Sequence, residues 1–247
     1  MALLAAKAAD PALNEQAVAG SFDALVANLS APEVETEADV VSLLETMRLQ
    51  GFGTRPLQQV GLEHSNVAWV LEHKQGLPIT LAVILIMCAR HLGLSGTGIN
   101  FPGHFLVRIG TSLVDPLRME MVERDALQRE GLDALEMEQL LQPASPLELG
   151  LRMLNNLKGF HLARDDWGEA LQVLDYQLAL TCKGTRKDTE LCAALHYERG
   201  ELWEQLGAFS VARDAYAQCQ KFTSRADLAA SANQQIANLD GRNETFH

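Results

Sequence analysis

The sequence predicts an α+β N-terminal domain, with a buried central helix and a small antiparallel sheet, followed by an all-α domain of helical repeats. Three observations support this fold class. Residues 81–89 read LAVILIMCA, without one polar side chain. Two short apolar segments, residues 105–109 and 112–114, flank a Gly-Thr pair. The C-terminal half contains two turn-and-helix segments that resemble each other.

The central helix is predicted over residues 78–92, about four turns. Pro78 suits the first turn of a helix, where a backbone N–H is not needed, and Gly93 suits the end. A helix that is apolar on all sides is expected to be buried on all sides. The uniformly apolar run is too short to cross a membrane, which takes roughly 18 residues.

Three further helices are predicted before it, packed around it. Residues 37–49 form an amphipathic pattern with one apolar face. Residues 21–29 also show helical spacing, and Ser21 is the expected N-cap. Residues 66–72 are expected to form a short helix.

The segments after the central helix predict a hairpin. Residues 105–109 and 112–114 are the two strands, and residues 98–101 are a further short strand. His104 begins the first hairpin strand and Asp115 ends the second, so antiparallel pairing is expected to bring the imidazole and the carboxylate within reach. Pro102 and Gly103 form the turn that places His104.

A buried helix followed by His on one strand and Asp on the next resembles the transglutaminase-like, papain-like cysteine fold. In that fold a Cys at the start of the central helix is the nucleophile, His is the base and Asp orients it. Ala82 and residues 90–93 fit the family's sequence motif, and aligning them with it places the nucleophile position on Pro78. Proline has no thiol, so the resemblance implies a chain that retains His104 and Asp115 without a nucleophile.

Two other side chains, both within the predicted helix, are candidate nucleophiles. Cys88 lies about 15 Å along the helix from Pro78 and is expected to be a core thiol. Thr80 is closer to the helix start, so a Thr80–His104–Asp115 hydrolase or acyl transferase is the alternative. The other interpretation of Thr80 is a hydrogen bond to backbone in the first helical turn.

The sequence motifs are also similar to those of bacterial SirB-type proteins, which join a transglutaminase-like domain to tetratricopeptide repeats. The matching stretches are residues 65–71, residues 76–81 and residues 100–105, which read NFPGHF. Ser65-Asn66 inverts the family's usual order and Thr80 replaces its Ser. The resemblance implies no reaction, because that family is regarded as lacking proven catalysis.

A boundary is predicted at Gln142-Pro143, giving a transglutaminase-like domain over residues 1–142 and a helical domain over residues 143–247. Residues 122–141 look helical. Ser145 is a good N-cap, with Pro146 at the first helical position and Glu148 at the third.

The second half repeats with an offset of 42 residues, residues 165–170 resembling residues 207–212. A tetratricopeptide repeat has a period of about 34, so an insertion near residues 182–187 is inferred. A final helix over residues 225–239 is expected to cap the repeats.

Composition limits the partners. The formal net charge is −12, which argues against nucleic acid and anionic membranes. The four cysteines form no CxxC pair and are interpreted as reduced thiols of a cytoplasmic protein. No closely spaced His and Cys residues indicate a metal site, and nothing indicates a cofactor. The N-terminal segment lacks a long apolar core, so a signal peptide is not expected.

The sequence therefore predicts a catalytically silent scaffold that binds a protein or peptide partner in a regulatory role. The active hydrolase with a non-Cys nucleophile is the second hypothesis. A metabolite sensor that uses the old cleft as a pocket is the third.

Overall fold

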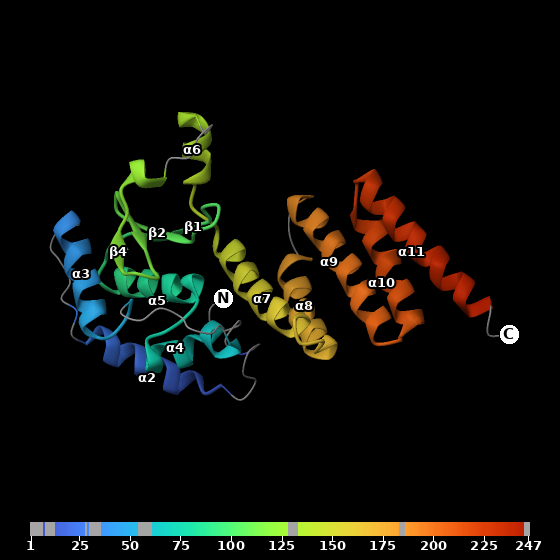
Figure 1. Cartoon of the computed structure of the whole chain (residues 1–247), viewed down its shortest axis with the longest axis horizontal. Helices are drawn as coiled ribbons and strands as arrows, with labels where there is room; N and C mark the ends of the chain where they lie inside the picture. Colours follow the sequence, from blue (N-terminus) through green and yellow to red (C-terminus); the bar gives the residue numbers. More distant parts are fainter. Residues whose placement is uncertain are drawn as a thin grey trace. The chain divides into compact units, whose positions relative to one another are not determined.

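A computed structural model of the chain describes residue 7 and residues 13–27, 29, 36–53, 61–127, 133–182 and 186–244. The chain forms two compact units, Met1–Met153 and Leu154–His247, called here the N-terminal and C-terminal units. Together they are mostly helical, with one small antiparallel sheet (Figure 1). Among the described helices, none alone is long and apolar enough to cross a membrane. Helices α4 (Val67–His73) and α5 (Pro78–His91) pass a length and composition test only as a pair, bent by 79°.

The centre of the N-terminal unit is α5 (Pro78–His91), whose residues from Ile79 to Ile86 are all buried. The sheet lies on one side of α5 and α4 on another (Figure 1). Pro78 occupies the start of the helix, as predicted. From Ile79 to Ala89 every residue except Met87, which is 37% exposed, is buried, so the apolar sequence is explained by burial within the protein.

The sheet has four antiparallel strands in the order β1-β2-β3-β4. They are β1 (Gly96–Ile99), β2 (Leu106–Ile109), β3 (Ser112–Asp115) and β4 (Glu120–Met121). Val107 is opposite Val114 and Ile109 is opposite Ser112, so the predicted hairpin is confirmed. Strand β1 starts two residues earlier than the predicted 98–101, and β4 has no counterpart in the sequence analysis.

Helices α2 to α4 precede α5, and their starts are set by side-chain caps. Helix α2 (Glu15–Val26) is capped by Asn14, whose side chain accepts hydrogen bonds from Gln16 and Ala17. The prediction that Ser21 caps this helix is wrong, because Asn14 offers an earlier cap and Ser21 lies inside the helix. Helix α3 (Glu37–Leu49) has the predicted bounds and a capping box. A 3₁₀ turn (Leu62–Ser65) leads to α4 (Val67–His73), which Asn66 caps.

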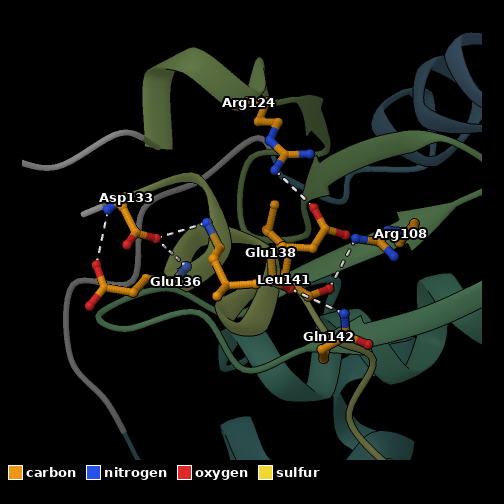
Figure 2. A network of polar contacts seen from close by, with 8 residues as sticks. Arg108, Arg124, Asp133, Glu136, Glu138, Leu141 and Gln142 are labelled. Carbon is orange, nitrogen blue, oxygen red and sulfur yellow. Dashed lines mark hydrogen bonds and ion pairs between the residues drawn. The ribbon is translucent and has the colours of Figure 1, made fainter.

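Residues 122–141 do not form one helix. A 3₁₀ turn (Arg124–Leu127) and a short helix, α6 (Ala134–Leu140), are the regular elements there. Asp133 starts α6 by accepting hydrogen bonds from two backbone N–H groups, as Figure 2 shows. Met137 and Leu141 then join Ile99, Phe101 and Leu106 in one buried cluster.

The segment after α6 is tied to the sheet. Pro143 forms an antiparallel bridge with Ile99, and the Ala144 N–H donates to the carbonyl of Gly98 at 2.8 Å. Helix α7 (Pro146–Leu162) then begins with the predicted capping box, in which Ser145 and Glu148 exchange hydrogen bonds of 3.2 and 2.7 Å. The compact units divide within α7, whereas the sequence places the domain boundary at residues 142 and 143.

The C-terminal unit continues with α8 (Trp167–Thr181), α9 (Arg186–Gln205), α10 (Phe209–Phe222) and α11 (Ala226–Glu244) (Figure 1). Each of these helices packs on the next along the chain. Gly200 of α9 lets the Tyr216 ring approach, because a Cβ there would lie 2.5–2.7 Å from ring atoms. The final helix was predicted, and it starts one residue later and runs further than expected.

One cysteine prediction is wrong. Cys182 and Cys192 form a disulfide, while Cys88 and Cys219 are free and buried. The sequence suggested four reduced thiols because the two cysteines are ten residues apart in the chain. The packing of α8 against α9 brings them together, and no local spacing shows that.

Candidate functional site

The start of α5 presents no reactive group to solvent. Pro78 is half-buried at the first helical position. Thr80 is fully buried, and among the described residues its hydroxyl has no hydrogen-bond partner. The expected hydrogen bond from Thr80 to backbone is therefore not formed, and neither is a bond to His104.

His104 lies on a tight turn between β1 and β2. Its backbone N–H donates to the carbonyl of Phe101 at 3.0 Å. Gly103 has a φ of 78°, which is typical of the third residue of a type II turn that has proline second. The turn that Pro102 and Gly103 were expected to form is present, and it leaves His104 exposed.

Asp115 ends β3, and its carboxylate has other partners. The register places Asp115 opposite Leu106, two residues beyond His104. Its Oδ1 accepts a hydrogen bond from the Leu117 N–H at 2.8 Å, and its Oδ2 is 4.0 Å from Nε of Arg118. Strand β2 begins at Leu106, so the prediction that His104 begins this strand is wrong, and His104 lies in the turn before it. No hydrogen bond joins His104 to Asp115 in the part of the chain that the structure describes.

Cys88 is a core thiol, as the sequence predicts. Its side chain is fully buried inside α5. Burial raises the pKa of the Cys88 thiol to about 12, and the nearby Lys74 charge opposes that shift only in part. A thiol that stays protonated at neutral pH is a poor nucleophile.

The loop motif Asn100–Phe105 binds a residue that the sequence analysis missed. Arg152 of α7 donates from Nη1 to Oδ1 of Asn100 at 2.8 Å. Its guanidinium also lies over the Phe105 ring, 5.2 Å from the centroid. Arg152 is 52 residues from Asn100 in the chain, so no local pattern marks the contact. Two motif residues therefore hold the first turns of α7.

A polar cavity of about 520 Å³ lies at the other end of the hairpin, around the turn at Gly110 and Thr111. Its wall includes Arg108, Arg124 and Glu138. Figure 2 shows how these are held: Arg124 donates to Glu138 at 2.9 Å, and Arg108 donates to the carbonyl of Leu141 at 3.0 Å. Arg108, Arg124 and Glu138 already have partners and form a fixed polar wall, and Glu37 and Glu123 also line the cavity. His104 and Asp115 are not among its lining residues.

A second cavity, of about 640 Å³, lies within the C-terminal unit and is called here the acidic cavity. Its lining residues are Lys158, Leu162, Trp167, Glu198, Glu201, Leu202, Glu204, Gln205, Tyr216 and Gln235. The three glutamates follow one another at intervals of three on α9, which places them on one helix face.

The acidic cavity has an unbalanced negative charge. Lys158 is buried and forms an ion pair with Glu198. The Tyr216 hydroxyl donates to Glu204 at 2.6 Å, which together with burial raises the pKa of Tyr216. Glu201 has no hydrogen-bond or ion-pair partner among the described residues. Burial first, then the charges of Glu198 and Glu204, raise the pKa of Glu201. The sequence analysis did not select these residues, although their spacing was visible.

Comparison with known proteins places residues 16–155 in a family model described as the transglutaminase-like superfamily. A UPF0162 protein of Xylella fastidiosa strain Temecula1 is 37% identical over 124 residues, 45% of this chain and 44% of that protein. One from Xylella fastidiosa strain 9a5c is 34% identical over 175 residues, 64% of this chain and 59% of that protein. One from Pseudomonas aeruginosa is 33% identical over 177 residues, 66% of this chain and 60% of that protein. The chain thus spans about half the length of these relatives. No solved structure gives a significant match.

Proposed function

The chain belongs to the transglutaminase-like superfamily, and we propose that it is a catalytically silent member that binds a protein or peptide partner in a regulatory role. The observation that carries the proposal is the start of α5. Where the family resemblance expects a nucleophilic thiol, the chain has Pro78. Without an attacking atom at this position, His104 has no nucleophile to activate there.

The surroundings of the other candidate catalytic residues also support the absence of catalysis. An attacking hydroxyl must reach both a base and a substrate carbonyl, at about 2.6–3.2 Å from the base. Thr80 is fully buried, so a substrate cannot reach its hydroxyl without opening the core. His104 is exposed, and Asp115 is bonded to Leu117 instead of the imidazole. These contacts disfavour the Thr80–His104–Asp115 hydrolase.

The acidic cavity supports partner binding by the C-terminal unit. Glu201 has no counter-ion in the described chain, and like charges on Glu198 and Glu204 make a cation favourable there. The half-buried Trp167 adds aromatic surface to the wall. We infer that the partner presents a Lys or Arg side chain to this cavity, which lies among helices of the tetratricopeptide kind in this chain. We also propose that the chain is a SirB-type protein and that its C-terminal helices are tetratricopeptide-like repeats.

The test of silence is a turnover assay. The full chain would be incubated with a glutaminyl peptide, with and without a primary amine, and products followed by mass spectrometry. We expect no hydrolysis or amine transfer above the buffer rate, and the same result for His104→Ala. Turnover that His104→Ala abolishes would refute silence.

The test of partner binding uses labelled peptides with a central Lys or Arg and, as a comparison, a central Glu. We expect the basic peptides to bind more tightly, and Glu201→Gln to weaken that binding. Glu169→Gln is the matched control, because Glu169 is exposed on α8 and does not line the cavity. Equal affinity for all three peptides, or equal loss in both variants, would contradict the assignment to this cavity.

A further inference from the structure

A second group of reactive side chains lies away from both cavities, where α8 meets α9. Cys182 follows the last residue of α8 and is exposed, whereas Cys192 is buried in α9. His196 is four residues after Cys192, which puts both on the same face of α9. The two sulfur atoms and one ring nitrogen of His196 all lie within 4.8 Å of one another.

The His196 ring is held in place by stacking, and one of its nitrogen atoms has no hydrogen-bond partner among the described residues. The His196 ring stacks on Phe222, with centroids 5.4 Å apart and planes 4° from parallel. Its Nδ1 is buried, and among the residues that the structure describes it has no hydrogen-bond partner. Leaving a buried polar atom unpaired is unfavourable, so such an atom needs an explanation. A disulfide alone needs no imidazole beside it.

The donor set matches a metal more closely than it matches a structural disulfide. Two thiolates and one neutral imidazole are ligands that zinc prefers, and a site with three protein ligands keeps one position for water. Two thiolates would also neutralise the charge of the ion. Two charged groups act on His196, those of Arg199 and Asp175; they are 3.3 Å apart and balance each other.

We propose that, when the Cys182–Cys192 disulfide is reduced, the chain binds one zinc ion through both sulfur atoms and a ring nitrogen of His196. A dithiol reductant supplies two electrons and two protons, which opens the S–S bond to two thiols while the reductant becomes a disulfide. Zinc binding then releases both thiol protons to solvent. Oxidation by another disulfide reverses the first step and expels the ion, so the disulfide and the zinc site exclude each other.

The geometry allows this exchange. Tetrahedral ligation at Zn–S of about 2.3 Å needs the sulfur atoms roughly 3.8 Å apart. The Cα atoms of the two cysteines are 5.7 Å apart. Cys182 lies at a helix end and is exposed, so its side chain has room to turn, and it is the sulfur that a reductant reaches first.

The test is a cobalt titration of the full chain, reduced or left oxidised, with the reductant removed under anaerobic conditions. We expect the reduced chain to bind one Co²⁺, with the visible absorption of tetrahedral cobalt and sulfur-to-cobalt charge transfer, and Zn²⁺ to abolish both. The oxidised chain is expected to show neither signal. Cys182→Ser and His196→Ala should each weaken binding at least tenfold, and His91→Ala, an exposed histidine of α5, should not.

Two outcomes would overturn the proposal. One is a reduced chain that binds no cobalt, or binds it without a one-to-one stoichiometry and without the tetrahedral spectrum. The other is unchanged binding in both Cys182→Ser and His196→Ala. The comparison between oxidised and reduced wild-type chain needs no variant, so it decides the matter even if a substitution disturbs folding.

Discussion

The contact between Gly200 and Tyr216 yields the sharpest stability prediction. A methyl group at Gly200 would lie 2.5–2.7 Å from three atoms of the Tyr216 ring. That ring is fully buried, and its hydroxyl is held by Glu204 at 2.6 Å. Gly200→Ala must therefore push α9 and α10 apart, or force the ring off its rotamer toward the acidic cavity and away from Glu204.

The expected effect is the difference between two terms. Overpacking a core typically costs about 1–3 kcal/mol, and a clash with three rigid ring atoms belongs near the upper end. Alanine in a helix interior recovers about 1 kcal/mol relative to glycine. We therefore expect Gly200→Ala to lower the free energy of unfolding by about 1–2 kcal/mol, measured as a lower urea midpoint by circular dichroism.

Gly159→Ala is the matched control. Gly159 also lies inside a helix, α7, but a methyl group there meets nothing within 4 Å. It should raise the free energy of unfolding by up to about 1 kcal/mol. If Gly200→Ala stabilises the protein as Gly159→Ala does, the close approach of α9 and α10 is refuted.

Three other predictions follow from burial, charge and capping. Burial raises the pKa of Cys88 to about 12 and of Cys219 to about 11, so a disulfide-exchange reagent should label neither thiol of the unreduced native chain at pH 8, and both in denaturant; rapid native labelling would contradict this. The folded-state pKa of Glu201 is raised, so the stability from this carboxyl is present at low pH and lost as the pH rises through that pKa. Glu201→Gln should thus raise the urea midpoint at pH 7 and leave it unchanged below about pH 4, where the free carboxyl is protonated. Asn66→Ala removes the acceptor for the Ala68 N–H and should lower stability by about 1 kcal/mol, whereas Asn66→Asp should retain it; equal unfolding midpoints for both variants would count against this cap.

Local signals predicted the elements whose cause is local. The run from residue 81 to 89 is apolar because all of it except Met87 is buried, and Pro78 begins the helix. The apolar segments around Gly110 form the hairpin. Ser145 and Glu148 form the predicted capping box.

The missed features depend on contacts between distant segments. Strand β4 exists because Met121 pairs with Val114, and it ends immediately before the stretch that looked helical. The disulfide joins residues from two helices, and Arg152 reaches a motif 52 residues away. For the candidate site, the sequence correctly predicted Asp115 at the end of a strand, whereas His104, expected to begin a strand, lies in the turn before β2. The sequence could not show that the Leu117 N–H donates a hydrogen bond to the Asp115 carboxylate.

The two borders of the sheet limit how a partner could engage the N-terminal unit. On the β1 side, Pro143 and Ala144 already run along the strand and occupy the Gly98 carbonyl. On the β4 side, the strand is two residues long and begins with the exposed Glu120, which is paired with Arg48. Short, charged or covered borders oppose strand addition from another polypeptide. Recognition by extension of the β-structure is therefore disfavoured in this unit, and its contacts with other molecules would be made by side chains.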